Sequence, residues 1–312
     1  MKREHYRGTL TQTPVYLGKL LRMFFYQSDW KVLPMAAIIA GLVTFVTGQN
    51  MFFTQEGTLT GCFALVCVCI WNGFFNSIQV VCRERAIVKR EHRAGMKIRA
   101  YIGAHMIYQC ILCLLQTAIT LGVSHVAEVR LPASGLITPW GIVDLFISLF
   151  LITYASDIMS LAVSCIVNNT TTAMTVMPFL LIIQLVFSGG FFELGGAAKK
   201  LTVLTVSRWG LQSLGTIGNY NSLPMVTLWN TIFKFKDMEI EGQKPVYMVI
   251  RYIEQNGLVD AVIQESGAYN QNPMFEYTVG NLLTCWLMLV LFIIVFGVVS
   301  CIALRFVDRD SR

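Results

Sequence analysis

Amide and carboxyl side chains inside long apolar runs are the residues of this sequence most able to do chemistry. Asn72, Asn76 and Gln79 recur at helical spacing, so they share one face of a helix and could line a polar path. Asp157 lies within another apolar run, where an ionised carboxylate costs about 2.5–3.5 kcal/mol at the centre of a bilayer. Asp157 must therefore face protein or water. Together with His105 it could form a proton relay.

Two further polar faces lie on the third and fourth apolar runs. Their members are His105, Gln109 and Gln116 on one, and Thr153, Asp157, Ser160 and Ser164 on the other. Such side chains can also hydrogen-bond between helices of one protomer, which contributes about 0.6–2 kcal/mol per contact. We favour this structural role for these two faces, and a functional role for the face that carries Asn72.

Motifs for catalysis or cofactor binding do not occur in the sequence. It has no G-x-x-x-x-G-K-[ST] phosphate loop, no H-E-x-x-H and no G-x-S-x-G. The four histidines are scattered, and the nine cysteines follow no zinc or redox spacing. We therefore expect no catalytic residue, no metal and no cofactor bound by this chain. If ATP and magnesium are used, a partner subunit should hold them.

The composition and the apolar run lengths indicate which kind of element carries these side chains. The chain has 312 residues, of which 55% are hydrophobic and 13% are charged, and its mean hydropathy is +0.59. Soluble domains carry about 25% charged residues, so an ordinary soluble enzyme is excluded. Six apolar stretches are each long enough for a helix to cross a bilayer: 32–53, 59–82, 100–123, 142–167, 173–192 and 279–304. The fold class predicted is an all-α polytopic membrane protein with six transmembrane helices.

The distribution of Lys and Arg predicts orientation. With the N-terminus inside, 16 of the 24 Lys and Arg residues fall in internal segments, which places both termini in the cytoplasm of a multi-pass cell-membrane protein. The expected organisation is a cytoplasmic arm (1–31), transmembrane helices one to five (32–192), a re-entrant and extracellular segment (193–278), the sixth helix (279–304) and a cytoplasmic tail (305–312). Pro245 and Gly257 bracket one short amphipathic helix in the extracellular segment.

The arm and the segment 83–97 are both expected to form cytoplasmic helices. Thr13 and Pro14 resemble an N-cap and a first helical residue, and the apolar residues that follow predict an amphipathic helix in the membrane interface. Segment 83–97 alternates acidic and basic residues at helical spacing, which predicts a short helix with internal ion pairs. Such a helix, held between two spans, is suited to transmit motion from a cytoplasmic motor.

Three motifs resemble those of type-2 ABC exporter permeases, in particular the membrane domain of the White-type G subfamily. They are Glu84-Arg85 followed by Arg90-Glu91-His92 and Ala100-Tyr101, the stretch 187–192 (FSGGFF), and the stretch 207–211 (SRWGL). The resemblance implies a prokaryotic half-transporter that exports an amphipathic or hydrophobic cargo, such as a lipid, a drug-like compound or a peptide. Its implied partners are an ABC ATP-binding subunit, a second permease copy or paralogue, and membrane lipid, with no nucleic acid.

The resemblance also implies roles for individual residues. Coupling to the ATPase falls to Glu84, Arg85, Arg90, Glu91 and His92. The cargo cavity between two protomers would be lined by Asn72, Phe75, Asn76, Gln79, Met177, Leu181 and Gln184. Phe191 and Phe192 stand where the family has an apolar plug. The alternatives are a secondary transporter that uses Asp157 and His105, and a membrane scaffold that transports nothing.

Overall fold

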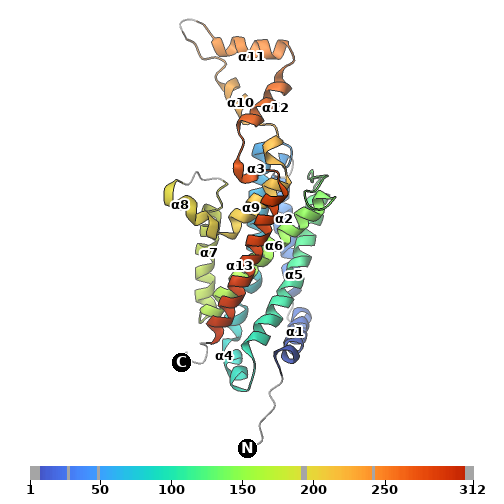
Figure 1. The fold of residues 1–312 in the computed structure, drawn as a ribbon, viewed down its shortest axis with the longest axis vertical. Coiled ribbons are helices and arrows are strands. Elements are labelled where there is room, and N and C mark those ends of the chain that lie inside the picture. Colours follow the sequence, from blue (N-terminus) through green and yellow to red (C-terminus); the bar gives the residue numbers. More distant parts are fainter. Residues whose placement is uncertain (1–7, 27–28, 48–49, 191–194, 241–242, 306–312) are drawn as a thin grey trace, which may run out of the picture.

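The computed structural model describes residues 8–26, 29–47, 50–190, 195–240 and 243–305 and shows an elongated helical bundle (Figure 1). In chain order the α-helices are α1 (Thr9–Tyr26), α2 (Val32–Thr47), α3 (Gln55–Ser77), α4 (Val80–Arg93), α5 (Ile98–Val126), α6 (Gly141–Ile166), α7 (Thr170–Val186), α8 (Gly196–Leu201), α9 (Val206–Ile217), α10 (Thr227–Lys234), α11 (Pro245–Gln255), α12 (Val259–Tyr269) and α13 (Val279–Arg305). Isolated bridges, such as Ser134 with Trp140, are the β-structure of the described residues. The fold is all-α, as predicted.

Helix α6 forms the centre of the bundle. It packs on α3, α5, α9 and α13, and most of its side chains are buried all round. A helix that is apolar on every side is typical of such a central position. Gly73 on α3 permits the closest approach, since a Cβ there would lie 2.5 Å from the Thr153 oxygen of α6. The polar residues of α3 and α6 are therefore brought together at this crossing.

Four helical stretches have the length and apolarity needed to cross a membrane: Gln55–Arg93, Ile98–Val126, Gly141–Ile166 and Val279–Arg305. The first of them combines α3 and α4. Helices α2 and α7 are also apolar but shorter, with 16 and 17 residues. They begin where the first and fifth predicted spans begin, within three residues, but each ends six residues earlier.

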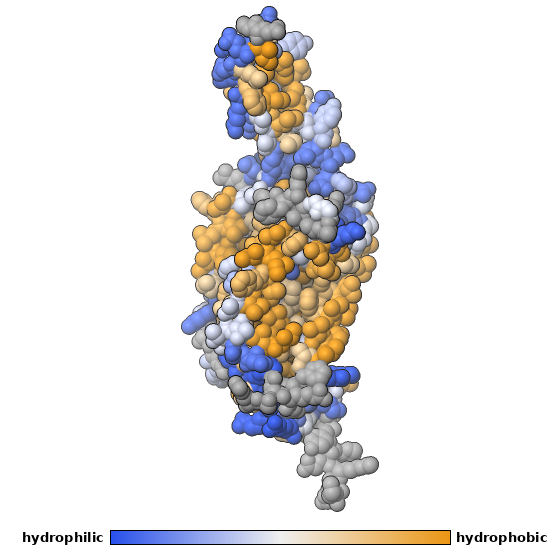
Figure 2. Space-filling view, turned by 90° about the vertical axis from the view of Figure 1, so that its left-hand side faces the viewer, coloured by the Kyte–Doolittle hydropathy of each residue, from blue (hydrophilic) through white to orange (hydrophobic). Residues whose placement is uncertain are grey.

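The surface has the polarity expected of a membrane protein. Figure 2 shows an apolar band around the middle of one face, between polar regions at both ends. Large exposed apolar side chains are contributed by several of the long helices, among them Phe45, Ile111, Leu115, Leu287 and Ile294. Because no protein covers them, this band is the part of the surface suited to contact lipid tails.

The two ends of the bundle differ. Helices α1 and α4 lie at one end, which we call the α4 end, and helices α10, α11 and α12 extend beyond the other (Figure 1). Helix α11 confirms the predicted helix between Pro245 and Gly257. The predicted start of α1 at Thr13 is wrong, since α1 begins at Thr9 and contains Pro14. Proline at the sixth position removes one backbone hydrogen bond and leaves the other turns intact.

Candidate coupling and translocation site

Helix α4 follows α3 almost without interruption and begins against α6. The backbone N–H groups of Val81 and Cys82 donate to Oγ of Ser164, at 3.1 and 3.2 Å. The first N–H groups of a helix have no partner within the helix. Gln79, the residue before α4, makes no side-chain capping bond. The Ser164 hydroxyl of α6 therefore caps two of the first N–H groups of α4 in its place.

Arg85, in the middle of α4, connects this helix to the C-terminal end of α6. Its Nη1 donates to the carbonyl oxygens of Cys165 and Val167, both at 3.0 Å. Cys165 lies in the last turn of α6 and Val167 follows that helix directly, where carbonyl oxygens also lack partners within the helix. Because a charged donor strengthens both bonds, Arg85 ties α4 firmly to the end of α6.

Helix α1 holds α4 from a second side. Lys19 and Glu84 form an ion pair at 3.5 Å. Burial, together with the charge of Glu91 and a hydrogen bond to it, raises the pKa of Tyr16 to about 12. Gln12 donates to the Gly95 oxygen at 3.2 Å and accepts from the Lys97 N–H at 2.9 Å.

His92 stabilises the turn that follows α4, since its Nδ1 lies 3.0 Å from the Met96 oxygen. The amphipathic arm is thus joined to the predicted coupling helix and the turn after it by side-chain contacts.

The remaining face of α4 is exposed. Arg83, Ile87 and Arg90 recur at helical steps along it, and 39% of the Ile87 surface is accessible. Of the five residues predicted to couple, Arg90 lies on this face, while Glu84, Arg85, Glu91 and His92 contact their own protomer. Arg83 and Ile87 were not singled out from the sequence. Their exposure depends on which side of α4 packs on α6.

A cluster of polar side chains fills the crossing of α3, α5 and α6. The amides of Asn76 and Gln116 donate to each other at 2.8 and 3.0 Å. Asp157, which is fully buried, accepts from the Ser77 hydroxyl, from Nδ2 of Asn76 at 3.3 Å and from Sγ of Cys113 at 3.2 Å. Among the described residues, Asp157 has no ion pair with a basic side chain. The cluster ties three helices together inside one protomer.

The other polar residues of α5 and α6 also bond mainly within the protomer. Ser160 donates to the Phe74 oxygen at 2.9 Å, and Ser164 caps α4. Thr153 donates to Leu149 of its own helix. This arrangement agrees with the structural role favoured for these two faces.

His105 does not take part in the Asp157 cluster. Both of its ring nitrogens are buried with no hydrogen-bond partner among the described residues, and its ring packs 4.5 Å from that of Tyr101. Ser77, Asn76 and Cys113 are the partners of Asp157. The structure does not favour a proton relay between Asp157 and His105.

A cavity of about 320 Å³ lies beside the cluster, near α4. Three residues predicted to line a cargo cavity contribute to it: Phe75, Asn76 and Gln79. The rest of its wall comes from Val32, Ile78, Val80, Arg83, Tyr108, Gln109, Leu112 and Met174. The lining therefore combines aromatic, aliphatic and amide groups with one cation at the α4 end. It suits a ligand with an apolar body and a polar group.

The four other predicted cavity residues lie elsewhere. Asn72, Met177, Leu181 and Gln184 are buried in the protomer and do not line this cavity. Gln184 accepts from the Ser207 N–H at 3.1 Å, and the Ser207 hydroxyl donates to the Gln184 backbone oxygen. Gln184 thus anchors α9, the short buried helix predicted to be re-entrant, to α7. Phe191 and Phe192 fall outside the described residues.

Two comparisons with known proteins agree with this architecture. A family model described as ABC-2 type transporter matches residues 21–200, which include α2 to α7. The chain is also similar to an ABC transporter ATP-binding/permease protein, Rv1747, of Mycobacterium tuberculosis, with 27% identity over 143 residues. That alignment covers 45% of this chain and 16% of the mycobacterial protein, so the chain spans a small part of this relative.

Proposed function

This chain belongs to the ABC-2 type transporter family and is a membrane subunit of an ABC transporter, and we propose that it is the permease of an ATP-driven exporter. The observation that carries the proposal is that α4 is anchored to its own protomer and yet accessible. Side chains of α4 contact α6 and α1, while Arg83, Ile87 and Arg90 of the same helix are exposed. A helix held in this way can transmit a push from a docked motor into the bundle, because its own protomer leaves it little room to rotate.

The motor is an ATP-binding subunit on a separate chain, which holds ATP and magnesium. The basic face of α4 would meet an acidic groove on that subunit, with Ile87 as an apolar anchor between the charges. The proposal places the α4 end in the cytoplasm of a cell-membrane protein. It is supported by the seven Lys and Arg residues in positions 83–99.

Six spans are part of the same proposal. Helices α2 and α7 are apolar and have 16 and 17 residues, just below and at the lower limit of about 17 for crossing a bilayer. The placement of α1, α4 and α9 supports a layout similar to that of the White-type G subfamily, and hence a half-transporter of prokaryotic type. Such a permease works as a dimer, either with a second copy or with a paralogue.

The cargo is proposed to be amphipathic or hydrophobic: a lipid, a drug-like compound or a peptide. The support is the cavity of about 320 Å³, whose wall combines Phe75, Leu112 and Met174 with the polar groups of Gln79 and Gln109. Apolar walls with a few polar groups bind ligands of that kind. The cavity lies next to α4, where an inward-facing cargo site should be.

The test is a charge reversal on the exposed face of α4. In Arg90→Glu, we expect the amount of co-purified ATP-binding subunit and the rate of ATP-driven transport to fall at least about tenfold, because a like charge replaces an attraction. The thermal unfolding midpoint should stay at the wild-type value, since Arg90 is exposed. Arg251→Glu on α11 is the matched control, because Arg251 is exposed beyond the other end of the bundle. Wild-type co-purification and transport in Arg90→Glu would refute the docking assignment.

A further inference from the structure

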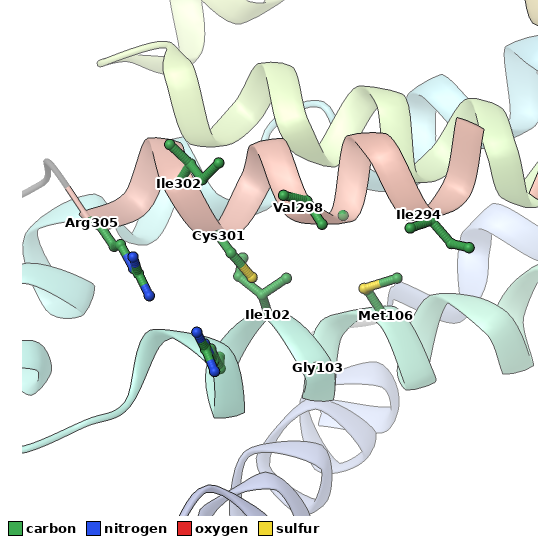
Figure 3. A pocket seen from close by; sticks show the side chains of 10 residues that line it. Ile102, Gly103, Met106, Ile294, Val298, Cys301, Ile302 and Arg305 are labelled. Carbon is green, nitrogen blue, oxygen red and sulfur yellow. The ribbon is translucent and has the colours of Figure 1, made fainter. Parts of the chain in front are cut away.

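A groove of about 590 Å³ separates the α4-side halves of α5 and α13. Its lining residues are Arg99, Ile102, Gly103 and Met106 on α5, and Ile294, Gly297, Val298, Cys301, Ile302 and Arg305 on α13. Figure 3 shows Cys301 directed from α13 towards Ile102 of α5, and Ile294 facing Met106 farther along the groove. This groove is distinct from the cavity beside the polar cluster, and the proposed transport function does not use it.

Two glycines create the apolar part of the groove. A Cβ added to Gly103 would meet no atom within 4 Å, so the space beside this residue is open. On the facing helix, a Cβ added to Gly297 would lie 3.2 Å from Cε of Met106. The floor is therefore closed by Met106, whereas the slot beside Gly103 is unfilled. Apart from the two arginines, the lining is aliphatic and sulfur-containing, so the slot suits a hydrocarbon chain.

Both charges of the groove are at one end. Arg99 on α5 and Arg305 on α13 are exposed, and both line the groove at the α4 end. Neither guanidinium forms an ion pair with a carboxylate in the part of the chain that the structure describes. Two arginines at the same end of a groove are suited to bind a phosphate group, which can accept hydrogen bonds from both.

The length of the groove matches one leaflet of a bilayer. From Ile294 to Arg305 the helix rises by eleven residues, or about 16 Å at 1.5 Å per residue. Half of a hydrocarbon core that is about 30 Å thick is about 15 Å. An acyl chain lying in the slot would thus end near Ile294 when its phosphate is at the level of the arginines.

We propose that this groove is a binding site for one anionic phospholipid. Its phosphate contacts Arg99 and Arg305, and one acyl chain lies beside Gly103 between α5 and α13. The lipid fills the gap between these helices. It thereby stabilises the bundle near the end at which α4 would contact the ATP-binding subunit. The assignment concerns a resident lipid rather than cargo, and it holds whether or not the chain transports anything.

The experiment is a lipid titration of the purified, delipidated full chain in nonionic detergent, without ATP, followed by native mass spectrometry. Dioleoyl phosphatidylglycerol is the probe, and dioleoyl phosphatidylcholine is the competitor. We expect one phosphatidylglycerol to bind per chain, in preference to phosphatidylcholine. Arg99→Gln or Arg305→Gln should weaken binding about fivefold, and the double variant about 30-fold. Lys97→Gln, an exposed cation outside the groove, is the matched control and should bind as the wild type does.

A second pair of variants tests the acyl-chain slot. Gly103→Leu fills the slot and retains both arginines, so it should lose phosphatidylglycerol while its unfolding midpoint is unchanged. Gly122→Leu is the control, because a Cβ there also meets nothing within 4 Å and it lies outside the groove. Inorganic phosphate in excess should not displace the lipid. The proposal is overturned if phosphate displaces it, if Gly103→Leu binds as the wild type does, or if Gly103→Leu separates a dimer and leaves lipid binding intact.

Discussion

Asn76 illustrates how one side chain can serve two purposes. Its amide is buried in the cluster with Gln116 and Asp157, yet the residue also lines the cavity beside α4. Hydrogen bonding thus fixes the amide, so the part of the cavity wall that Asn76 contributes is pre-set. A pre-set wall costs less ordering on ligand binding than a mobile one. Arg85, by contrast, has one role in the structure: its charged group faces α6 and donates to the Cys165 oxygen.

We expect Asn76→Leu to lower the free energy of unfolding by about 1–3 kcal/mol, because it leaves the buried amide of Gln116 without its partner. The double variant Asn76→Leu/Gln116→Leu should cost less than the sum of the single changes, by about 0.6–1.7 kcal/mol. Unfolding in mixed detergent micelles measures both values, with Thr284→Val on the exposed side of α13 as the control. Strict additivity would show that the two amides are not coupled.

Tyr16 predicts a change of stability with pH. The pKa of Tyr16 is about 12 in the folded protein against 10.0 ordinarily, so the folded state holds the proton more tightly. Its contribution to stability is complete below about pH 10 and is lost as the pH rises towards about 12. Between about pH 9 and pH 12, the thermal unfolding midpoint should therefore fall less steeply with pH in Tyr16→Phe than in the wild type. The control is Tyr269→Phe, at an exposed tyrosine of α12. Equal slopes in Tyr16→Phe and the wild type would contradict the prediction.

The contact between α3 and α6 is the element on which the site depends. Ser77 and Asn76 reach Asp157 only because the two helices approach closely at Gly73. Helix α6 also holds α4, through Ser164 and Arg85. If α4 couples to a motor as proposed, we expect a shift of α4 to reach this crossing first, and from there the wall of the cavity.

We expect Gly73→Ala to destabilise the protein by about 1–3 kcal/mol or more, because the new Cβ would lie 2.5 Å from the Thr153 oxygen and 2.8 Å from the Asp157 nitrogen. Neither backbone atom can move without displacing α6. Gly122→Ala on α5 should be neutral or slightly stabilising, since nothing lies within 4 Å of its Cβ. The comparison is made by thermal unfolding in detergent, and equal midpoints for the two variants would show that the helices do not approach as described.

At the level of the molecule, an apolar band lies between two polar ends (Figure 2). Most of the band is suited to lipid, but one stripe on α3 differs, because Trp71 and Phe75 stack with ring centroids 5.4 Å apart and each is 44% exposed. On α7, Phe179 and Ile182 are also exposed. If the chain pairs with a second permease subunit as proposed, we expect these two helices to form the interface, next to the cavity that Phe75 lines.

This interface predicts the outcome of photo-cross-linking in membranes. Phe75→p-benzoylphenylalanine should give a permease dimer on irradiation, because the side chain would face the second subunit. Leu287→p-benzoylphenylalanine on α13, at a residue that is 68% exposed, should cross-link to lipid and give no dimer. Gel electrophoresis separates the products. A dimer formed through position 287 but not through position 75 would place the interface on the wrong side of the bundle.

Local patterns in the chain were sufficient for the class of membrane protein and for its long helices. Apolar run length located four long apolar helices and the beginnings of two shorter ones, α2 and α7, and helical spacing located α4, because backbone hydrogen bonds within a segment require nothing from the rest of the fold. Which way each side chain faces depended on packing between distant segments. Arg85 faces α6, Gln184 holds α9, and Arg99 and Arg305 meet at a groove, since crossing angles and close approaches at glycines are set by contacts 23 to more than 200 residues apart.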